Sequence, residues 1–212
     1  MSIKCLKCFR PEQSCYCQNI SPVDPGIKFV YLMHPQEAYK QKTGTGRLAS
    51  LSLTDSEIII DSTFDNNLRL IELINDERYY PMVLYPDKNA YYAESFNFKE
   101  IAKERILLIF LIDATWVLAK KMMFRSPSLQ KLPKLSFKRE YRSHFLIKKQ
   151  PADYCLSTIE SSYYLNKQLQ QAGVCSKTVN VEGLLMIFDK MIQDQLKRKK
   201  NNCKFNESCI IL

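Results

Sequence analysis

The stretch that decides the fold is Ile106-Leu107-Leu108-Ile109-Phe110-Leu111-Ile112, followed directly by Asp113-Ala114-Thr115-Trp116. A continuous apolar run of this length, rich in branched residues, predicts a central parallel strand buried on both faces. Asp113 then lies at the carboxyl end of the strand, which is the edge where open α/β sheets bind ligands. The local pattern equally fits a second interpretation, in which Asp113 caps the helix expected at 117–124 and Trp116 fills the core.

Strand and helix patterns alternate along the rest of the chain. This alternation predicts an α/β fold, with a mostly parallel sheet and helices on both of its faces. A Pro- and Gly-containing linker at 21–26 separates a Cys-rich hook, residues 1–20, from the main domain at 27–200, and a tail follows at 201–212. The expected strands are 27–33, 57–60, 82–85, 106–112, 135–137 and 145–148, and the expected helices are 49–53, 67–75, 98–104, 117–124, 158–171 and 178–199.

Composition indicates a globular protein. The 212 residues are 46% hydrophobic and 25% charged, which suits one domain of ordinary size with a small appendage. No apolar segment follows a basic start, and no run approaches the length that spans a bilayer, so we expect a cytoplasmic protein without stable membrane contact. The final Cys-Ile-Ile-Leu, behind a polybasic run, allows a second localisation, with a membrane anchor through prenylation of Cys209.

The charge balance favours a polyanionic partner. Lys and Arg number 31 against 22 Asp and Glu, a net charge of +9. Four of these charges lie at 197–200, where they also suit a helix end. Other cations, among them Lys120, Lys121 and Arg125, closely follow Asp113, so a phosphate backbone would approach the candidate site. We therefore predict a nucleic-acid partner, with a generally basic surface as the alternative.

Four cysteines are spaced as metal ligands. Cys5, Cys8, Cys15 and Cys17 lie within thirteen residues as two close pairs, and such pairs can bring four thiolates around one tetrahedral ion. Without a signal peptide, metal binding or reduced thiols are favoured over disulfides. The spacing predicts a structural zinc site in the hook, and the alternative is four reduced thiols in a disordered tail.

The ordered set of motifs resembles the DTW-domain family, the tRNA-uridine aminocarboxypropyltransferases. Asp-x-Thr-Trp at 113–116 resembles the signature that gives the family its name, and the other motifs occur in the family's order between Cys5 and Gly183. After the Cys-rich N-terminus these motifs are His34-Pro35-Gln36-Glu37, Thr45-Gly46-Arg47-Leu48, Leu84-Tyr85-Pro86, Lys120-Lys121-Met122, Leu132-Pro133, Gln150-Pro151 and Ser157-Thr158-Ile159-Glu160.

The resemblance implies both a fold and a reaction. The fold would be like that of the SPOUT RNA modifiers, whose C-terminal part is threaded into a knot. The reaction would transfer the aminocarboxypropyl group of S-adenosylmethionine to N3 of a tRNA uridine. Asp113 would be the base, and partial burial beside Trp116 would strengthen it. The donor would bind Tyr85, Pro86, Thr115, Trp116, Leu132, Pro133, Ser157, Thr158 and Glu160, and the tRNA would bind Arg47, Lys120, Lys121 and Arg125.

Several of these residues also have structural interpretations. Ser157-Thr158-Ile159-Glu160 fits a helix capping box, and the same helix N-terminus could seat a ligand carboxylate. Arg47 could bind either the amino-acid carboxylate of the donor or an RNA phosphate, and elsewhere such a residue is commonly a surface cation. Two other functions stay open, a SPOUT-like methyltransferase that uses the same donor and a zinc-bearing RNA-binding module without catalysis.

Overall fold

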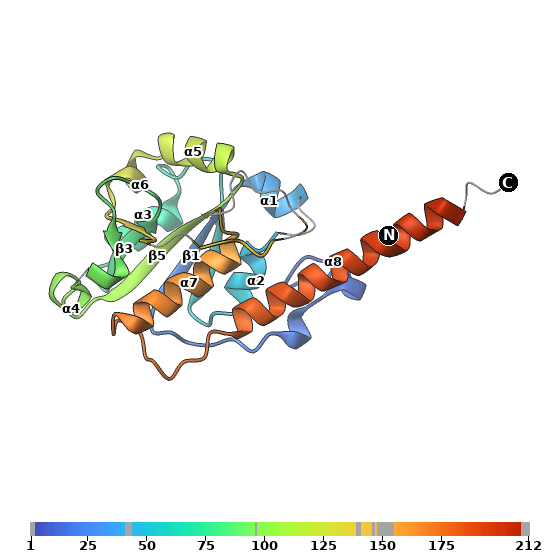
Figure 1. Ribbon diagram of the computed structural model, residues 1–212. Coiled ribbons are helices and arrows are strands. Elements are labelled where there is room, and N and C mark those ends of the chain that lie inside the picture. The colour runs from blue at the N-terminus through green and yellow to red at the C-terminus, as the bar shows by residue number, and fades with distance from the viewer. Residues whose placement is uncertain are drawn as a thin grey trace.

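The computed structural model is built on one parallel sheet, in the order β2-β1-β5-β3-β6-β4 (Figure 1). The structure describes residues 3–40, 44–95, 97–138, 141–145, 147 and 155–208. Every strand pairing in these ranges is parallel, which confirms the predicted α/β class. The strands are β1 (Lys28–Met33), β2 (Ser56–Ile60), β3 (Tyr79–Leu84), β4 (Tyr91–Tyr92), β5 (Ile106–Asp113) and β6 (Lys134–Ser136).

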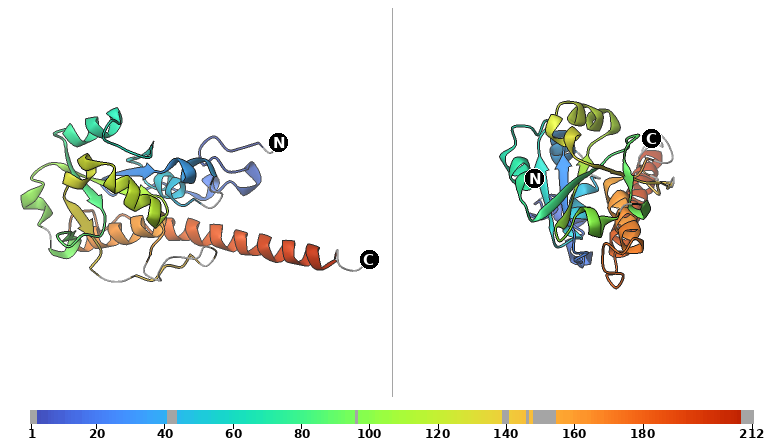
Figure 2. Two further views of the ribbon diagram at one scale, coloured as in Figure 1. Left: turned by 90° about the horizontal axis from the view of Figure 1, so that it is seen from above. Right: turned by 90° about the vertical axis from the view of Figure 1, so that its left-hand side faces the viewer.

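Helices cover both faces of the sheet (Figure 2). One face packs against α2 (Gly46–Leu51), α7 (Thr158–Gln171) and α8 (Gly183–Ser208). The other packs against α3 (Leu68–Asn75), α5 (Trp116–Phe124) and α6 (Pro127–Lys131). The C-terminal part of α8 extends well beyond the sheet and its covering helices. Shorter elements are α1 (Pro35–Lys40), α4 (Phe98–Ile101) and the 3₁₀ turns Glu12–Ser14, Cys17–Asn19 and Ala93–Ser95.

The apolar run of β5 is continuous because both of its faces are covered. Leu107, Ile109 and Leu111 pack with the helices of the first face. Leu108 and Phe110 alternate with them and pack with the helices of the second face. β5 lies between β1 and β3, as expected for a central strand. Its last residue, Asp113, therefore reaches the carboxyl edge of the sheet from a rigid, buried strand.

The last helix differs from its prediction at both ends. It begins at Gly183 instead of 178 and continues to Ser208 instead of 199. Local side-chain bonds hold the residues before it in turns, because Ser176 Oγ accepts from the Thr178 amide and Asn180 Oδ1 accepts from the Glu182 amide. The helix consequently extends through most of the segment expected to be a tail. Cys209 and the rest of the prenylation motif lie outside the described residues.

Other boundaries also differ from the prediction. Residues 145 and 147 belong to no strand, and 146 and 148 lie outside the described part of the chain. The edge of the sheet is instead β4, which at two residues is too short to produce a sequence pattern. The helix α1, from Pro35, was not predicted either, and it begins soon after β1. The threading implied by the resemblance stays a prediction.

The Cys-rich hook shares the core of the main domain. Tyr16 is buried in the cluster beneath α7 and α8, and Ile20 and Val23 pack against the same cluster. Val23 also forms a parallel bridge with Leu53, beside the C-terminal end of α2. The hook is therefore attached to the sheet by burial as well as by the peptide chain. None of the described helices is long and apolar enough to cross a membrane.

Candidate active site and metal centre

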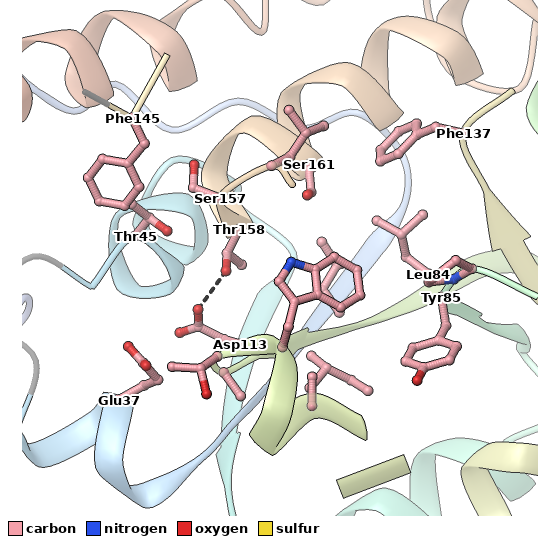
Figure 3. A pocket seen from close by; sticks show the side chains of 18 of the residues that line it. Glu37, Thr45, Leu84, Tyr85, Asp113, Phe137, Phe145, Ser157, Thr158 and Ser161 are labelled. Atoms are coloured by element: carbon pink, nitrogen blue, oxygen red, sulfur yellow. Dashed lines mark hydrogen bonds between the residues drawn. The ribbon is translucent and has the colours of Figure 1, made fainter. Parts of the chain in front are cut away.

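A pocket of about 320 Å³ lies at the carboxyl edge of the sheet (Figure 3). Its walls come from the ends of β3, β5 and β6, from the segment after β1, and from the N-terminus of α7. This is the edge where parallel sheets bind ligands. The lining residues are Glu37, Gly44, Thr45, Leu84, Tyr85, Pro86, Leu111, Ile112, Asp113, Ala114, Thr115, Trp116, Ala119, Leu135, Ser136, Phe137, Phe145, Leu156, Ser157, Thr158 and Ser161.

Asp113 is a buried carboxylate of this pocket. It is the last residue of β5, pairs in register with Met33 of β1, and is 5% exposed. The Thr158 hydroxyl donates to its Oδ1 at 2.5 Å, as the dashed line in Figure 3 shows. The N-cap of α5 is Thr115, whose Oγ1 accepts from the Leu118 amide at 3.5 Å. The structure therefore excludes the helix-cap interpretation of Asp113.

Gly46 lets α2 approach this carboxylate. A Cβ built on Gly46 would lie 2.6 Å from Asp113 Cγ and 3.1 Å from the Met33 methyl group. Real Cβ atoms essentially never reach the first of these separations, so a side chain at this position would displace either α2 or the Asp113 carboxylate itself. The absence of a side chain at 46 is thus a requirement of the site geometry.

A hydrogen-bonded chain orients the Thr158 end of the site. Ser162 Oγ lies 2.8 Å from the Thr158 carbonyl oxygen and 3.0 Å from the buried Tyr31 hydroxyl. Burial raises the pKa of Tyr31 above its ordinary value, and the hydroxyl of Ser162 opposes this shift. Tyr31 therefore stays a neutral phenol, and the network fixes the first turn of α7 against the sheet.

The pocket has a polar end and an apolar end. Figure 3 shows Glu37 and Asp113 near one another, with Tyr85 and Phe137 on the opposite side. Glu37 is buried, like Asp113, so two carboxyl groups face the same enclosed space. Trp116, the chain's only tryptophan, also lines the pocket. Such a site can bind a ligand that is cationic at one end and aromatic at the other.

The residues predicted to bind the donor molecule fall into two groups. Six of them line the pocket, and they are Tyr85, Pro86, Thr115, Trp116, Ser157 and Thr158. Leu132, Pro133 and Glu160 do not line it. Leu132 is buried in the apolar cluster on the α5 face of the sheet, and the Pro133 carbonyl accepts from the Val83 amide.

Glu160 acts behind the pocket wall. Its Oε2 accepts from the Ser157 amide at 2.8 Å, which completes the predicted capping box of α7. The same oxygen accepts from the Ser143 hydroxyl, and Oε1 accepts from the His144 amide at 2.7 Å. With both oxygens occupied, Glu160 holds the segment that carries Phe145 into the pocket. Its role in this geometry is structural.

The cations predicted to bind tRNA also lie in two different places. Lys120, Lys121 and Arg125 are exposed on or just after α5, the helix that begins at the pocket. Arg47 is half-buried, lies 4.3 Å from the Phe9 ring centroid of the hook, and donates to the Ala38 carbonyl. Burial lowers the pKa of Arg47, and the negative charge of Asp113 opposes that shift. Arg47 thus contacts the hook and is absent from the pocket lining.

Sequence reasoning missed part of the lining. Glu37 and Thr45 belong to motifs of the family resemblance but were given no role in the site, and Phe137 and Phe145 were not singled out, yet all four face the pocket. Phe137 directly follows β6, so the rule that ligands bind at the carboxyl ends of strands could have identified it. Phe145 carries no such signal, because its position depends on the bonds between Glu160 and residues 143 and 144.

The hook cysteines form a metal-sized cluster. The Sγ atoms of Cys5, Cys8, Cys15 and Cys17 all lie within 4.8 Å of one another. Two of the pairs, Cys5 with Cys17 and Cys8 with Cys15, are 3.7 and 3.8 Å apart. Sulfurs at about 2.3 Å from a tetrahedral ion lie about 3.8 Å from one another, so the arrangement fits such an ion. The cluster could therefore hold a metal.

The backbone around Cys5 favours a thiolate. Hydrogen bonds from the amides of Cys8 and Lys7 lower the pKa of Cys5 to about 6. The amide of Phe9, whose φ of 59° turns the chain back, donates to the Cys5 carbonyl at 2.9 Å. Amides directed at a sulfur stabilise the charged form, which is the form that binds metal.

Comparisons with known proteins match the chain to one family. A family model described as the DTW domain matches residues 2–196. The chain is 28% identical to tRNA-uridine aminocarboxypropyltransferase 2 of Drosophila melanogaster over 165 residues, 75% of this chain and 63% of that protein. It is 28% identical to the Mus musculus protein of the same name over 185 residues, 83% of this chain and 59% of that protein. The matches thus span about 60% of the length of these relatives. No solved structure matches the chain.

Substitution of Gly46 by alanine should destabilise the fold. The added methyl group would overlap the Asp113 carboxylate, and overpacking of this kind costs about 1–3 kcal/mol in free energy of unfolding. Urea denaturation measures the change. The control is Gly183→Ala, where a Cβ meets nothing within 4 Å and stability should be unchanged or slightly higher. Equal stability of the two variants would show that α2 does not confine the Asp113 carboxylate.

Purified protein should contain about one zinc ion per chain, because the four sulfurs all lie within 4.8 Å of one another and can surround one ion. Metal analysis under reducing conditions measures the stoichiometry. Cys17→Ser should lower it, whereas Cys155→Ala, a buried cysteine outside the cluster, should not. Protein that carries no metal and takes up none when zinc is added would contradict the assignment.

Proposed function

The chain belongs to the DTW domain family, and from this premise we propose that it transfers the 3-amino-3-carboxypropyl group of S-adenosylmethionine to N3 of a tRNA uridine. The observation that carries the proposal is the enclosed Asp113 carboxylate, which Thr158 holds in a ligand-sized pocket of about 320 Å³. The relatives named above support the choice of reaction, since both are named for aminocarboxypropyl transfer to tRNA uridine.

The electrostatics of the pocket suit this donor. S-adenosylmethionine carries a positive sulfonium and an ammonium group near its reacting carbon. The buried carboxyl groups of Glu37 and Asp113 face the same end of the pocket and would stabilise these cations in a site with little water. The aromatic side chains of Tyr85, Phe137 and Trp116 offer faces against which adenine can stack.

Asp113 is proposed as the base of the reaction. The N3 proton of uridine moves to the Asp113 carboxylate, and N3 attacks the methylene carbon that is bonded to sulfur. The new N–C bond forms as the C–S bond breaks, and methylthioadenosine leaves with the electron pair. Thr158 holds one carboxylate oxygen in place, so the base does not have to reorient during proton transfer.

The tRNA would reach the pocket along α5. This helix begins at the pocket with Trp116 and presents Lys120 and Lys121 to solvent, and Arg125 follows at its end. Phosphates bound there would hold the RNA next to the site while the target base is turned out of its stack. An exposed aromatic side chain, Phe124, lies among these cations and could contact an unstacked base.

Replacing Asp113 by Asn should remove the base while preserving its size. Turnover at saturating donor should fall by about 10²–10⁴-fold, the usual contribution of a general base, with tRNA affinity within a few fold of wild type. Donor affinity should fall as well, because the variant lacks the negative charge that faces the cationic groups of the donor. Thr158→Val removes only the orienting hydroxyl and should produce a smaller loss in turnover, about tenfold. Mass spectrometry of nucleosides from tRNA incubated with enzyme and donor measures the product and its rate of formation.

The control for these variants is Asp65→Asn. Asp65 accepts from the Ser128 amide at 2.8 Å on the α6 side of the molecule, so its loss should change stability and leave turnover nearly unchanged. Wild-type turnover in Asp113→Asn would reduce Asp113 to a structural role. A methylated nucleoside from the wild-type enzyme would favour the methyltransferase alternative, and tRNA binding without any product would favour the RNA-binding module.

Binding of tRNA should weaken steeply with salt, because phosphate contacts release counterions. Changing Lys120, Lys121 and Arg125 together to Glu should lower the slope of log affinity against log salt by about 3, if each contacts one phosphate. The control reverses Arg78, Lys103 and Lys177, exposed cations near the opposite, amino-terminal edge of the sheet. Filter binding between low and physiological salt measures both. A slope equal to wild type in the α5 variant would exclude this surface.

A further inference from the structure

Arg10 joins three parts of the molecule that are far apart in sequence. It lies in the hook, two residues after Cys8, and is only 8% exposed. Its Nη2 donates to the Gly44 carbonyl at 2.8 Å and approaches the Met191 sulfur of α8 at 3.5 Å. The guanidinium also lies 5.4 Å from the Tyr16 ring centroid. A hook residue therefore holds the backbone of a residue that lines the pocket.

The surroundings of Arg10 depend on the state of the cysteine cluster. The Cys5 amide donates to the Arg10 carbonyl at 2.8 Å, so a residue of the cluster holds the backbone of Arg10 directly. Four thiolates around a divalent ion carry a net negative charge, which compensates a buried cation beside them. A metal-bound hook is thus the environment in which a buried guanidinium is stable.

The backbone that Arg10 holds belongs to the pocket wall. Gly44 and Thr45 line the pocket, and Gly46 is the residue that packs against Asp113. The bond from Arg10 to Gly44 is charge-assisted, which makes it stronger than a neutral hydrogen bond. Displacement of Gly44 would consequently move both the wall of the pocket and the residue beside its carboxylate.

We propose that Arg10 is a positioning residue that couples the metal-bound hook to the donor pocket. The bound metal sets the position of the Arg10 guanidinium, and Arg10 holds the Gly44 carbonyl so that the wall next to Asp113 is preformed for the donor. This inference rests on the proposed function for the identity of the donor. It assigns the hook a role inside the catalytic domain, whereas a hook that serves only RNA binding would influence tRNA affinity alone.

The test measures donor affinity as a function of metal and of Arg10. Trp116 is the chain's only tryptophan and lines the pocket, so its fluorescence reports binding of S-adenosylmethionine. Arg10→Met keeps much of the length of the side chain and removes its donors. We expect this substitution to weaken donor binding by about tenfold, which is within the range for the loss of a charge-assisted hydrogen bond. Zinc content and tRNA affinity should stay unchanged. Arg10→Lys, which keeps the charge and one donor group, should fall between this variant and wild type.

Removal of the metal is the second part of the donor-binding experiment. Wild-type protein stripped by a chelator under reducing conditions should show a similar loss of donor affinity, which added zinc restores. Stripping Arg10→Met should add little, because both changes break the same coupling. The control is Arg78→Met, which replaces an exposed arginine paired with Asp76 and should bind the donor like wild type.

The outcomes separate the coupling from the proposed function. Wild-type donor affinity in Arg10→Met, or losses from substitution and stripping that simply add, would overturn the coupling. Donor binding that is absent from wild-type protein would overturn the proposed function instead. In that case amide hydrogen exchange over residues 44–53 tests the coupling, which requires faster exchange both in Arg10→Met and in metal-free wild type. Unchanged exchange in Arg10→Met and in metal-free wild type would overturn the coupling. If Arg10→Met does not fold, metal-free wild type alone still tests the coupling.

Discussion

The close approach of α2 to the end of β5 is the constraint on which the site depends. A side chain at position 46 would displace α2 or the Asp113 carboxylate, because a Cβ there would lie 2.6 Å from Asp113 Cγ. Asp113 is then enclosed from one side by α2 and held from another by the Thr158 hydroxyl. An enclosed, oriented carboxylate is what general-base chemistry requires, so the packing of two short segments determines the chemistry that the pocket can support.

The sheet places this carboxylate because its interior strands are covered on both faces. Neighbouring side chains of β5 point in opposite directions, with Ile109 packed in the core beneath α7 and Phe110 in the core beneath α5. Movement of the strand along its axis would disturb both cores at once. The segments that follow β1, β3 and β6 carry Glu37, Tyr85 and Phe137 to the same edge. A ligand there meets side chains from most of the sheet, although few of them are neighbours in sequence.

The hook is held to the main domain by packing and hydrogen bonds. Tyr16 is buried in the core beneath α8, Arg10 bonds the carbonyl of Gly44, and Arg47 of α2 lies over the Phe9 ring. The Sγ atoms of its four cysteines all lie within 4.8 Å of one another and could hold a metal. The family match begins at residue 2, so it treats hook and sheet as one domain. A metal site of this kind can stabilise the fold and influence the pocket through the same contacts.

The sequence by itself determined the class of fold and the ends of its strongest elements. The apolar run at 106–112 predicted β5, and Ser157 with Glu160 predicted the start of α7. Burial on two faces and helix capping both produce patterns in residues that are close in sequence, so these elements could be recognised. Tertiary structure alone decided which residues meet in the pocket. Phe145 lines the pocket because the segment before it is bonded to Glu160, whereas Leu132 lies in the apolar core. Arg10 bonds Gly44, which is 34 positions away in sequence. Such contacts depend on how helices and strands pack in space, and no local pattern of residues records that packing.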